Sequence, residues 1–301
     1  MQLKQILTSA IFRFTGDQVP SPRLNAELLL MFTLNCDRAY LFAHPERELT
    51  EDEQSRYESA LADRARGVPA QYITGRQEFW GMDLIVTPAV LIPRPETEHI
   101  IETVLELQTS GLRPQTLAKE TPSTSEARSS KSEFRILDVG TGSGCIALAL
   151  AREFPHAEVH ASDLSVAALE IARANAARLQ LEDRIQFHEA DLLEGLDLGG
   201  LDFIVSNPPY VGESEADQVQ LEVRKFEPRQ AVFAGAAGTE IIARLIPQAQ
   251  TALRPGGWLI MEISGSVADE TKHLLSGWDD VRVTPDLQAI PRIVRARKPR
   301  Q

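Results

Sequence analysis

The spacing of hydrophobic residues changes along the chain, and the change predicts two regions of different architecture. In residues 1–75, apolar positions recur at the three- to four-residue interval of amphipathic helices. Pro22 after Ser21 is typical of a helix start, with Ser21 as the expected N-cap, and residues 50–67 begin at a Thr, end at a Gly and carry acids first and bases last. We therefore expect a small helical bundle over residues 1–75.

Prolines interrupt the next segment, residues 76–98, which contains a short strand-like run. This pattern predicts a hairpin or connector that leads into a helix. Residues 109–132 are rich in Ser, Thr and Pro and poor in apolar residues, which is typical of a flexible insertion without a core of its own.

From residue 134 onward, apolar strand-like runs alternate with helical patterns. Strands are expected at 134–139, 157–163, 184–191, 201–206 and 256–264, with two more in 281–298. The alternation predicts an α/β domain over residues 99–301, with a doubly wound, mostly parallel, seven-stranded sheet and an antiparallel edge.

Composition and charge exclude several classes of protein. No run approaches the roughly 18 apolar residues of a membrane-spanning helix, and the N-terminus lacks the pattern of a secretory signal. The two cysteines, Cys36 and Cys145, stand in unrelated contexts, so we expect neither disulfides nor a metal site, and a cytoplasmic location. The net charge of −12 argues against stable nucleic-acid binding.

A glycine-rich loop follows the first strand of the α/β region. Its glycines are Gly140, Gly142 and Gly144, with Thr141 and Ser143 between them, and a helix follows directly. Such loops let a ligand approach the backbone and the free N–H groups of a helix start. The G-x-G-x-G spacing is tighter than the dinucleotide fingerprint, and Asp138 before the loop suits a cationic ligand better than a pyrophosphate. We therefore expect S-adenosylmethionine, whose amino acid end is cationic.

Acidic residues end the next two strands. Asp163 lies about 20 residues after the loop, where an acid commonly binds both hydroxyls of a ribose. An ordinary helix N-cap is the alternative for Asp163, although Ser165 is also placed to serve as that cap. Asp191 is positioned to accept from the adenine amino group, with Leu192 offering backbone and apolar contact; a plain strand-end turn is the alternative.

The segment Asn207, Pro208, Pro209 and Tyr210 follows the fourth strand of the sheet. Ligands of such sheets bind beyond the carboxyl ends of the strands, so this segment faces the same crevice as the glycine loop. The Asn207 side-chain oxygen and the Pro208 carbonyl supply two acceptors on a rigid frame. They suit a planar –NH2 group, and Tyr210 offers it a stacking face. A Pro-rich turn without function is the alternative.

With these residues in place, the chain resembles the protein-(glutamine-N5) methyltransferases of peptide chain release factors, the PrmC/HemK family. The resemblance spans nearly the whole chain outside the insertion. It rests on SPRLNAELLL, AHPERELT, PAQYITGRQEFWGMDLIVTPAVLIPRPETE, LDVGTGSGCIALALA, SNPPY and LRPGGWLIMEI.

This resemblance implies a Rossmann-like methyltransferase that modifies the glutamine of a Gly-Gly-Gln loop in release factors. It implies cofactor binding at Gly140–Gly144, Asp163 and Asn207, substrate binding at Asn207–Tyr210, and recognition of the substrate protein by residues 1–75. The chain departs from the family at residues 264–269 and at Ala289 and Pro291. Arg94 and Glu96 either order the connector over the cofactor or form a surface ion pair.

Three alternatives remain open at this point. A glutamine methyltransferase of a ribosomal protein, or a nucleic-acid amino-methyltransferase acting on adenine N6 or guanine N2, would use the same Asn-Pro-Pro-Tyr chemistry. A non-catalytic protein that binds S-adenosylmethionine is the third. Only the last predicts that replacement of Asn207 leaves function unchanged.

Overall fold

A computed structural model describes residues 2–109 and 134–300, so the expected insertion at 109–132 lies, beyond Thr109, outside the described residues. The chain divides into two compact units. The first comprises residues 1–76, 86–88 and 220–226, and the second comprises 77–85, 89–219 and 227–301. Each unit is described by itself.

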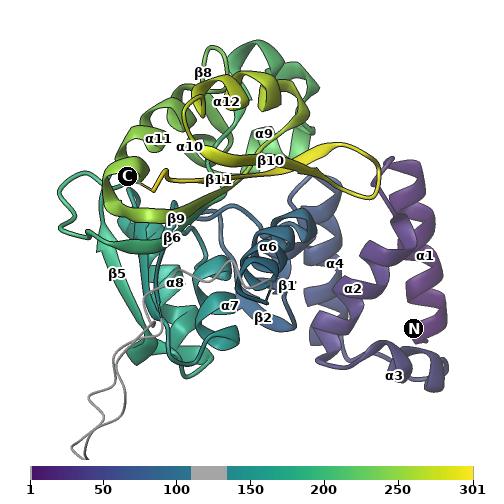
Figure 1. The fold of residues 1–301 in the computed structure, drawn as a ribbon. Helices are drawn as coiled ribbons and strands as arrows, with labels where there is room; N and C mark the ends of the chain where they lie inside the picture. Colours follow the sequence, from purple (N-terminus) through teal and green to yellow (C-terminus); the bar gives the residue numbers. More distant parts are fainter. Residues whose placement is uncertain (1, 110–133, 301) are drawn as a thin grey trace, which may run out of the picture. The chain divides into compact units, whose positions relative to one another are not determined.

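The first unit is helical (Figure 1). Its helices are α1 (Leu3–Gly16), α2 (Pro22–Leu34), α3 (Arg38–Ala43), α4 (Glu51–Ala65), α5 (Ala70–Thr74) and α9 (Leu221–Phe226). Phe14, Leu29 and Tyr57 are fully buried among α1, α2 and α4. The Tyr57 hydroxyl donates to the carbonyl of Ala26 at 2.9 Å, so the one polar atom of this ring is satisfied inside the core.

The ends of these helices follow their sequences with one exception. Thr50 and Glu53 form a reciprocal capping box at the start of α4. Ser21 occupies the N-cap position and Pro22 the first turn of α2, as expected, but Ser21 has a left-handed backbone, φ 46°, and its side chain makes no capping hydrogen bond.

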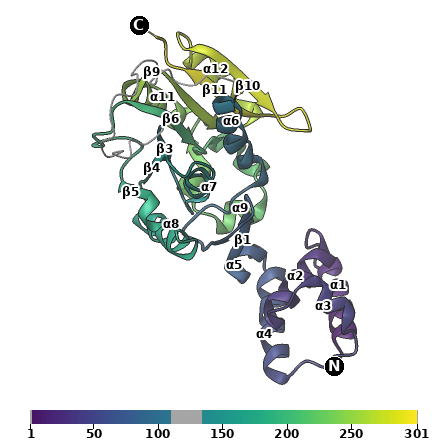
Figure 2. The same ribbon diagram turned by 60° about the horizontal axis from the view of Figure 1, so that its bottom comes forward.

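The second unit contains a seven-stranded sheet in the order β10-β11-β9-β6-β3-β4-β5 (Figure 2). The strands are β3 (Arg135–Val139), β4 (Glu158–Asp163), β5 (Ile185–Glu189), β6 (Leu201–Ser206), β9 (Leu253–Glu262), β10 (Asp279–Pro285) and β11 (Pro291–Arg297). β3, β4, β5, β6 and β9 run parallel, and β11 pairs antiparallel with both β9 and β10. The predicted doubly wound sheet with an antiparallel edge is confirmed.

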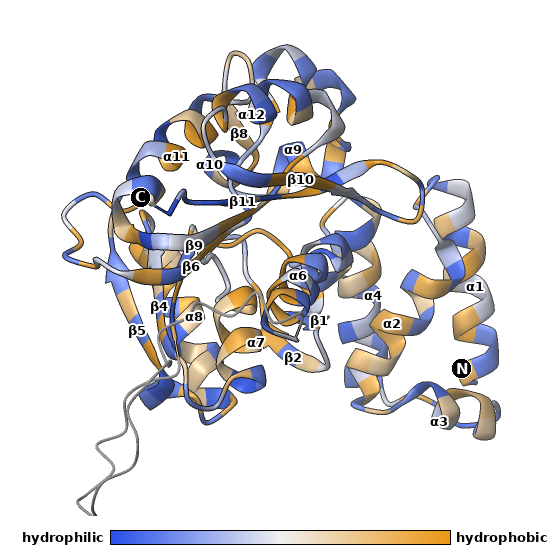
Figure 3. Cartoon of the chain, viewed as in Figure 1, coloured by the Kyte–Doolittle hydropathy of each residue, from blue (hydrophilic) through white to orange (hydrophobic). Residues whose placement is uncertain are grey.

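Alternate residues of the central strands pack on opposite faces of the sheet. On β6, Phe203 and Val205 join one apolar cluster, and Ile204 joins the other. The first cluster includes α6 (Glu98–Thr109), α7 (Cys145–Glu153) and part of α8 (Val166–Arg178), whereas the second includes α11 (Glu240–Ala252) and α12 (Ala268–Leu274). α7 is apolar almost throughout (Figure 3), and its residues 145–151 are all buried.

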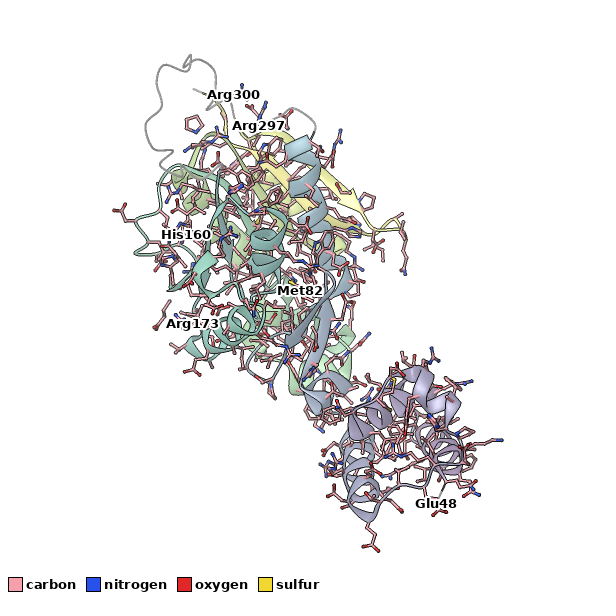
Figure 4. The ribbon with its side chains drawn as sticks, turned by 90° about the horizontal axis from the view of Figure 1, so that it is seen from below. Glu48, Met82, His160, Arg173, Arg297 and Arg300 are labelled. Atoms are coloured by element: carbon pink, nitrogen blue, oxygen red, sulfur yellow. The ribbon has the colours of Figure 1, made fainter. Side chains whose placement is uncertain are left out.

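The connector begins as a two-stranded hairpin, β1 (Arg76–Phe79) and β2 (Met82–Ile85). Trp80 and Gly81 form its two-residue turn, both with positive φ, as the tightest hairpins require. Met82 and Leu84 are buried against the α6 and α7 side of the sheet (Figure 4). The short elements β7 (Val211–Gly212), α10 (Arg229–Val232) and β8 (Phe233–Gly235) complete the second unit.

Two of the positions that depart from the family pattern lie in turns. Ser264 precedes a short 3-10 helix at Gly265–Val267. Ala289 has φ 61°, a left-handed conformation that glycine adopts without strain. None of the helices in the described ranges is long and apolar enough to cross a membrane.

Candidate active site

The sheet reverses its strand order between β3 and β6, and the residues that follow these strands meet at one cavity. The loop after β3, the ends of β4 and β5, and the segment after β6 all contribute to its wall. The predicted residues that line it are Gly140, Thr141, Gly142, Ser143, Asp163, Asp191, Leu192, Asn207 and Pro209. Asp138, Gly144, Pro208 and Tyr210 are absent from the lining that the described residues form.

The glycine loop leaves room for a ligand where side chains would stand. Gly140 and Gly142 have φ of 72° and 55°, and a Cβ built on either would meet no atom within 4 Å. At Gly144, φ is 83° and a Cβ would lie 3.2 Å from the side chains of Ala172 and Leu148. Gly144 therefore lets α7 pack on α8, while Gly140 and Gly142 keep the cavity open.

Asp163 ties the glycine loop to the end of β4. Its Oδ2 accepts from the Gly142 N–H at 2.8 Å, and its Oδ1 accepts from the Ser165 N–H at 2.8 Å. The cap of α8 is Ser165, whose hydroxyl accepts from the Ala168 N–H. Burial raises the pKa of Asp163 above its ordinary value. Each of its oxygens retains a lone pair for a further donor.

Asp138 lies beneath the loop rather than on the cavity wall. It is completely buried, and its Oδ2 accepts from the Thr141 hydroxyl at 2.6 Å and from the Ala147 N–H at 3.2 Å. Its Oδ1 has no hydrogen-bond partner among the described residues. Burial raises the pKa of Asp138 to about 7. Asp138 thus organises the loop through Thr141, and its direct contact with a cationic ligand stays a prediction.

The end of β5 supplies Asp191 and Leu192. The Asp191 carboxylate accepts from Arg244 at 2.7 Å, so one of its oxygens already has a partner. Leu192 has a left-handed backbone, φ 59°, and its carbonyl accepts from the Ser162 hydroxyl at 3.0 Å. That hydrogen bond stabilises the strained backbone of Leu192 at the cavity wall. Strained backbone conformations of this kind cluster at ligand-binding sites.

Asn207 belongs to a chain of hydrogen bonds that the sequence did not predict. Its Nδ2 donates to the Thr97 hydroxyl at 3.1 Å, and that hydroxyl donates to Oε2 of Glu262 at 2.6 Å. The other Glu262 oxygen accepts from the Tyr210 hydroxyl at 3.0 Å. Burial and the nearby Glu262 carboxylate raise the pKa of Tyr210, so the phenol stays protonated and able to donate.

Thr97 and Glu262 are therefore the site residues that sequence reasoning missed. Both lie in segments that carry the family resemblance, but neither has a residue type that points to a role by itself. Thr97 is 110 residues from Asn207 and 165 from Glu262, and Tyr210 is 52 residues from Glu262, so only the fold brings these side chains together.

The connector residues Val90, Leu91 and Pro93 also line the cavity. Arg94 pairs with the buried Glu227, whose second oxygen accepts from the Ile92 N–H at 3.1 Å. The partner of Arg94 is thus Glu227 rather than Glu96, and this pair holds the connector beside the cavity.

Comparisons with known proteins identify the family. Residues 5–75 match the PrmC N-terminal domain and residues 124–225 match the methyltransferase small domain. The release factor glutamine methyltransferase of Koribacter versatilis is 55% identical over 300 residues, which cover 99% of each chain. The chain belongs to the release factor glutamine methyltransferases.

A second relative of this methyltransferase comes from Chlorobaculum tepidum, with 40% identity over 96% of this chain and 94% of the relative. Among solved structures, the hMettl16 catalytic domain matches with a TM-score of 0.52 and 18% identity, covering 85% of this chain and 84% of that one. The structural likeness supports the Rossmann-like methyltransferase fold and nothing finer.

Proposed function

We propose that this methyltransferase transfers a methyl group from S-adenosylmethionine to the side-chain nitrogen N5 of the glutamine in the Gly-Gly-Gln loop of peptide chain release factors. The observation that carries the proposal is the cavity in which the glycine loop, Asp163 and Asn207 meet. Full-length identity to release factor glutamine methyltransferases gives the substrate class.

The residues present fit S-adenosylmethionine. The open space above Gly140 and Gly142, and the unpaired Oδ1 of Asp138 beneath them, suit a polar ligand that approaches the backbone. Asp163 would hold the ribose hydroxyls, while Asp191 and Leu192 would meet the adenine. When bound, this cofactor supplies an electrophilic methyl group on a sulfonium and leaves as S-adenosylhomocysteine.

The chain's own residues would act on the substrate amide. An amide nitrogen is a poor nucleophile because its lone pair is delocalised toward the carbonyl. The Asn207 side-chain oxygen and the Pro208 carbonyl would accept its two hydrogens, orient it toward the methyl group and stabilise the positive charge that develops on nitrogen. One amide proton then leaves to solvent, and Pro209 and Tyr210 frame the flat group.

The helical region at residues 1–75 would recognise the release factor, and the protein would act in the cytoplasm, where translation terminates. We expect the release factor as partner, without stable nucleic-acid binding and without a membrane. The expected partner follows from the relative in Koribacter versatilis, which is a release factor glutamine methyltransferase. The net charge of −12 supports the expectation that the protein does not bind nucleic acid stably.

The test offers labelled S-adenosylmethionine and four acceptors side by side: a release factor, the same factor with the loop glutamine changed to alanine, ribosomal protein and DNA. We expect label on the unmodified release factor alone. Label on ribosomal protein or DNA would contradict the proposed substrate, and label on the alanine variant would contradict the proposed residue.

A further inference from the structure

The hydrogen bonds around Asn207 determine which of its amide atoms faces the cavity. The Thr97 hydroxyl has one proton, and its 2.6 Å contact with Glu262 places that proton on the carboxylate side. Toward Asn207 the hydroxyl can therefore only accept, and it receives Nδ2 at 3.1 Å. With the nitrogen held against Thr97, Oδ1 is the amide atom left for a ligand.

Glu262 directs this arrangement from the end of β9. Its side chain is 1% exposed, and an ionised carboxylate only accepts hydrogen bonds. Both hydroxyls that contact it, Thr97 and Tyr210, must therefore donate to it. The same carboxylate thus links the end of the connector before α6 to the segment after β6, which carries the proposed substrate contacts.

We propose that Glu262 is a positioning residue which, through Thr97, fixes the Asn207 amide with its oxygen toward the substrate. This inference rests on the proposed function and adds the origin of amide selectivity to it. With Oδ1 presented, Asn207 accepts from the –NH2 of a glutamine. In the flipped orientation two –NH2 groups would face each other, and neither can accept.

The same polarity discriminates glutamine from glutamate. A carboxylate has no hydrogen to donate to Asn207 Oδ1, so two acceptor atoms would face each other without a proton between them. The hydrogen-bond chain therefore selects a planar donor group.

Removal of the relay hydroxyl tests the inference. Thr97→Val keeps the shape of the side chain but frees the Asn207 amide to rotate. We expect kcat for release factor methylation to fall by about tenfold or more, by comparison with the loss of an oriented polar group. The affinity for S-adenosylmethionine and the KM for the release factor should change less than kcat, because Thr97 lies on the cavity wall but valine keeps its shape there and removes only the hydroxyl.

Three further variants separate positioning from general damage. Thr97→Ser retains the hydroxyl and should restore most of kcat. Thr103→Val is the matched control: Thr103 is similarly buried and its hydroxyl donates only to the His99 carbonyl within α6, at 2.7 Å, so kcat should be unchanged. In the Asn207→Ala background, Thr97→Val should cause no further loss, because Thr97 acts through Asn207.

Unchanged kcat in Thr97→Val would overturn the inference. So would losses from Thr97→Val and Asn207→Ala that multiply in the double variant. Failure of the proposed function gives a different result, since the parent protein would then not methylate the release factor at all.

Discussion

Asn207 lines the cavity, and a hydrogen bond within the fold determines the orientation of its side chain. Its nitrogen is bonded to Thr97, and the following Pro208 restricts its backbone to extended conformations. The side-chain oxygen is thus held ready before any substrate arrives. Preorganisation of this kind lowers the barrier because no group has to reorient during the reaction.

Replacement of Asn207 by alanine should therefore affect the chemical step far more than binding. We expect a loss of about 2–4 kcal/mol in transition-state stabilisation, the range seen when one oriented polar group is removed. Calorimetry should show retained S-adenosylmethionine binding beside the lost turnover. Equal turnover in variant and parent would show that the site is not catalytic.

The rate should also depend on the ionisation of Glu262. Burial raises the pKa of Glu262 above its ordinary value, and Glu96 raises it further, against the hydrogen bonds from Thr97 and Tyr210 and the charge of Arg292. The ionised form has no proton and must accept from both Thr97 and Tyr210, whereas the protonated form carries one O–H donor. The rate should fall as pH drops through this raised pKa, since protonated Glu262 can donate to Thr97 and reverse the hydrogen bond to Asn207.

A pH profile of kcat in two variants checks this assignment. Glu262→Gln cannot titrate, so its rate should be low and should lack the acidic limb. Asp138→Asn removes another buried acid near the site and should keep that limb. An acidic limb that survives in Glu262→Gln but disappears in Asp138→Asn would assign it to Asp138 instead.

At the scale of elements, Gly144 joins the cofactor loop to the packing of α7 on α8. Gly144→Ala would combine a φ of 83° with contacts of 3.2 Å to Ala172 and Leu148. We expect a loss of roughly 1–3 kcal/mol in the free energy of unfolding. Urea denaturation measures it, with Gly199→Ala as control because a Cβ there meets nothing within 4 Å and needs no positive φ. Equal stability of the two variants would contradict this account.

The spacing of hydrophobic residues predicted the helices and strands well, because the residues that look apolar in the sequence are the ones that the fold buries. Residues 201–206 are all buried in β6, between β3 and β9, and the apolar residues 203–205 on both faces are typical of a central parallel strand. The motifs at Gly140–Gly144 and Asn207–Tyr210 were recognisable for a similar reason, since each is a compact stretch whose residues act together.

The contacts between distant segments were beyond sequence reasoning. Asp138 carries a charge and precedes the glycine loop, which suggested a ligand contact, yet it bonds the loop from beneath. Tyr210 was expected to offer its ring, which stays a prediction, and the hydrogen bond from its hydroxyl to Glu262 was not foreseen. The sheet topology decides which strand ends lie side by side, and so which side chains become partners. The local sequence pattern around each residue does not contain that information.

At the scale of the whole molecule, a buried charge beneath the glycine loop should lower overall stability. The pKa of Asp138 is about 7 in the folded protein, against an ordinary value of 3.8. Between these values the folded protein holds a proton that the unfolded chain has lost, so this group's contribution to stability decreases as pH rises and stays low above about 7. Among the described residues, hydrogen bonds reach only Oδ2 of Asp138, so the buried charge is incompletely compensated.

Asp138→Asn should consequently stabilise the cofactor-free protein. At a pH above about 7 we expect a gain of roughly 1–3 kcal/mol in the free energy of unfolding, with a smaller gain in acid. Urea unfolding over a series of pH values measures both effects. A variant less stable than the parent above neutral pH would show that the charge is fully compensated.

The central claim is that the cavity methylates a glutamine side chain in a release factor. The most direct measurement is mass spectrometry of release factor peptides after reaction with parent protein and with Asn207→Ala. The account predicts one added methyl group on the side-chain nitrogen of the Gly-Gly-Gln glutamine with the parent and almost none with the variant. A methyl group on any other residue, or equal methylation by both proteins, would contradict it.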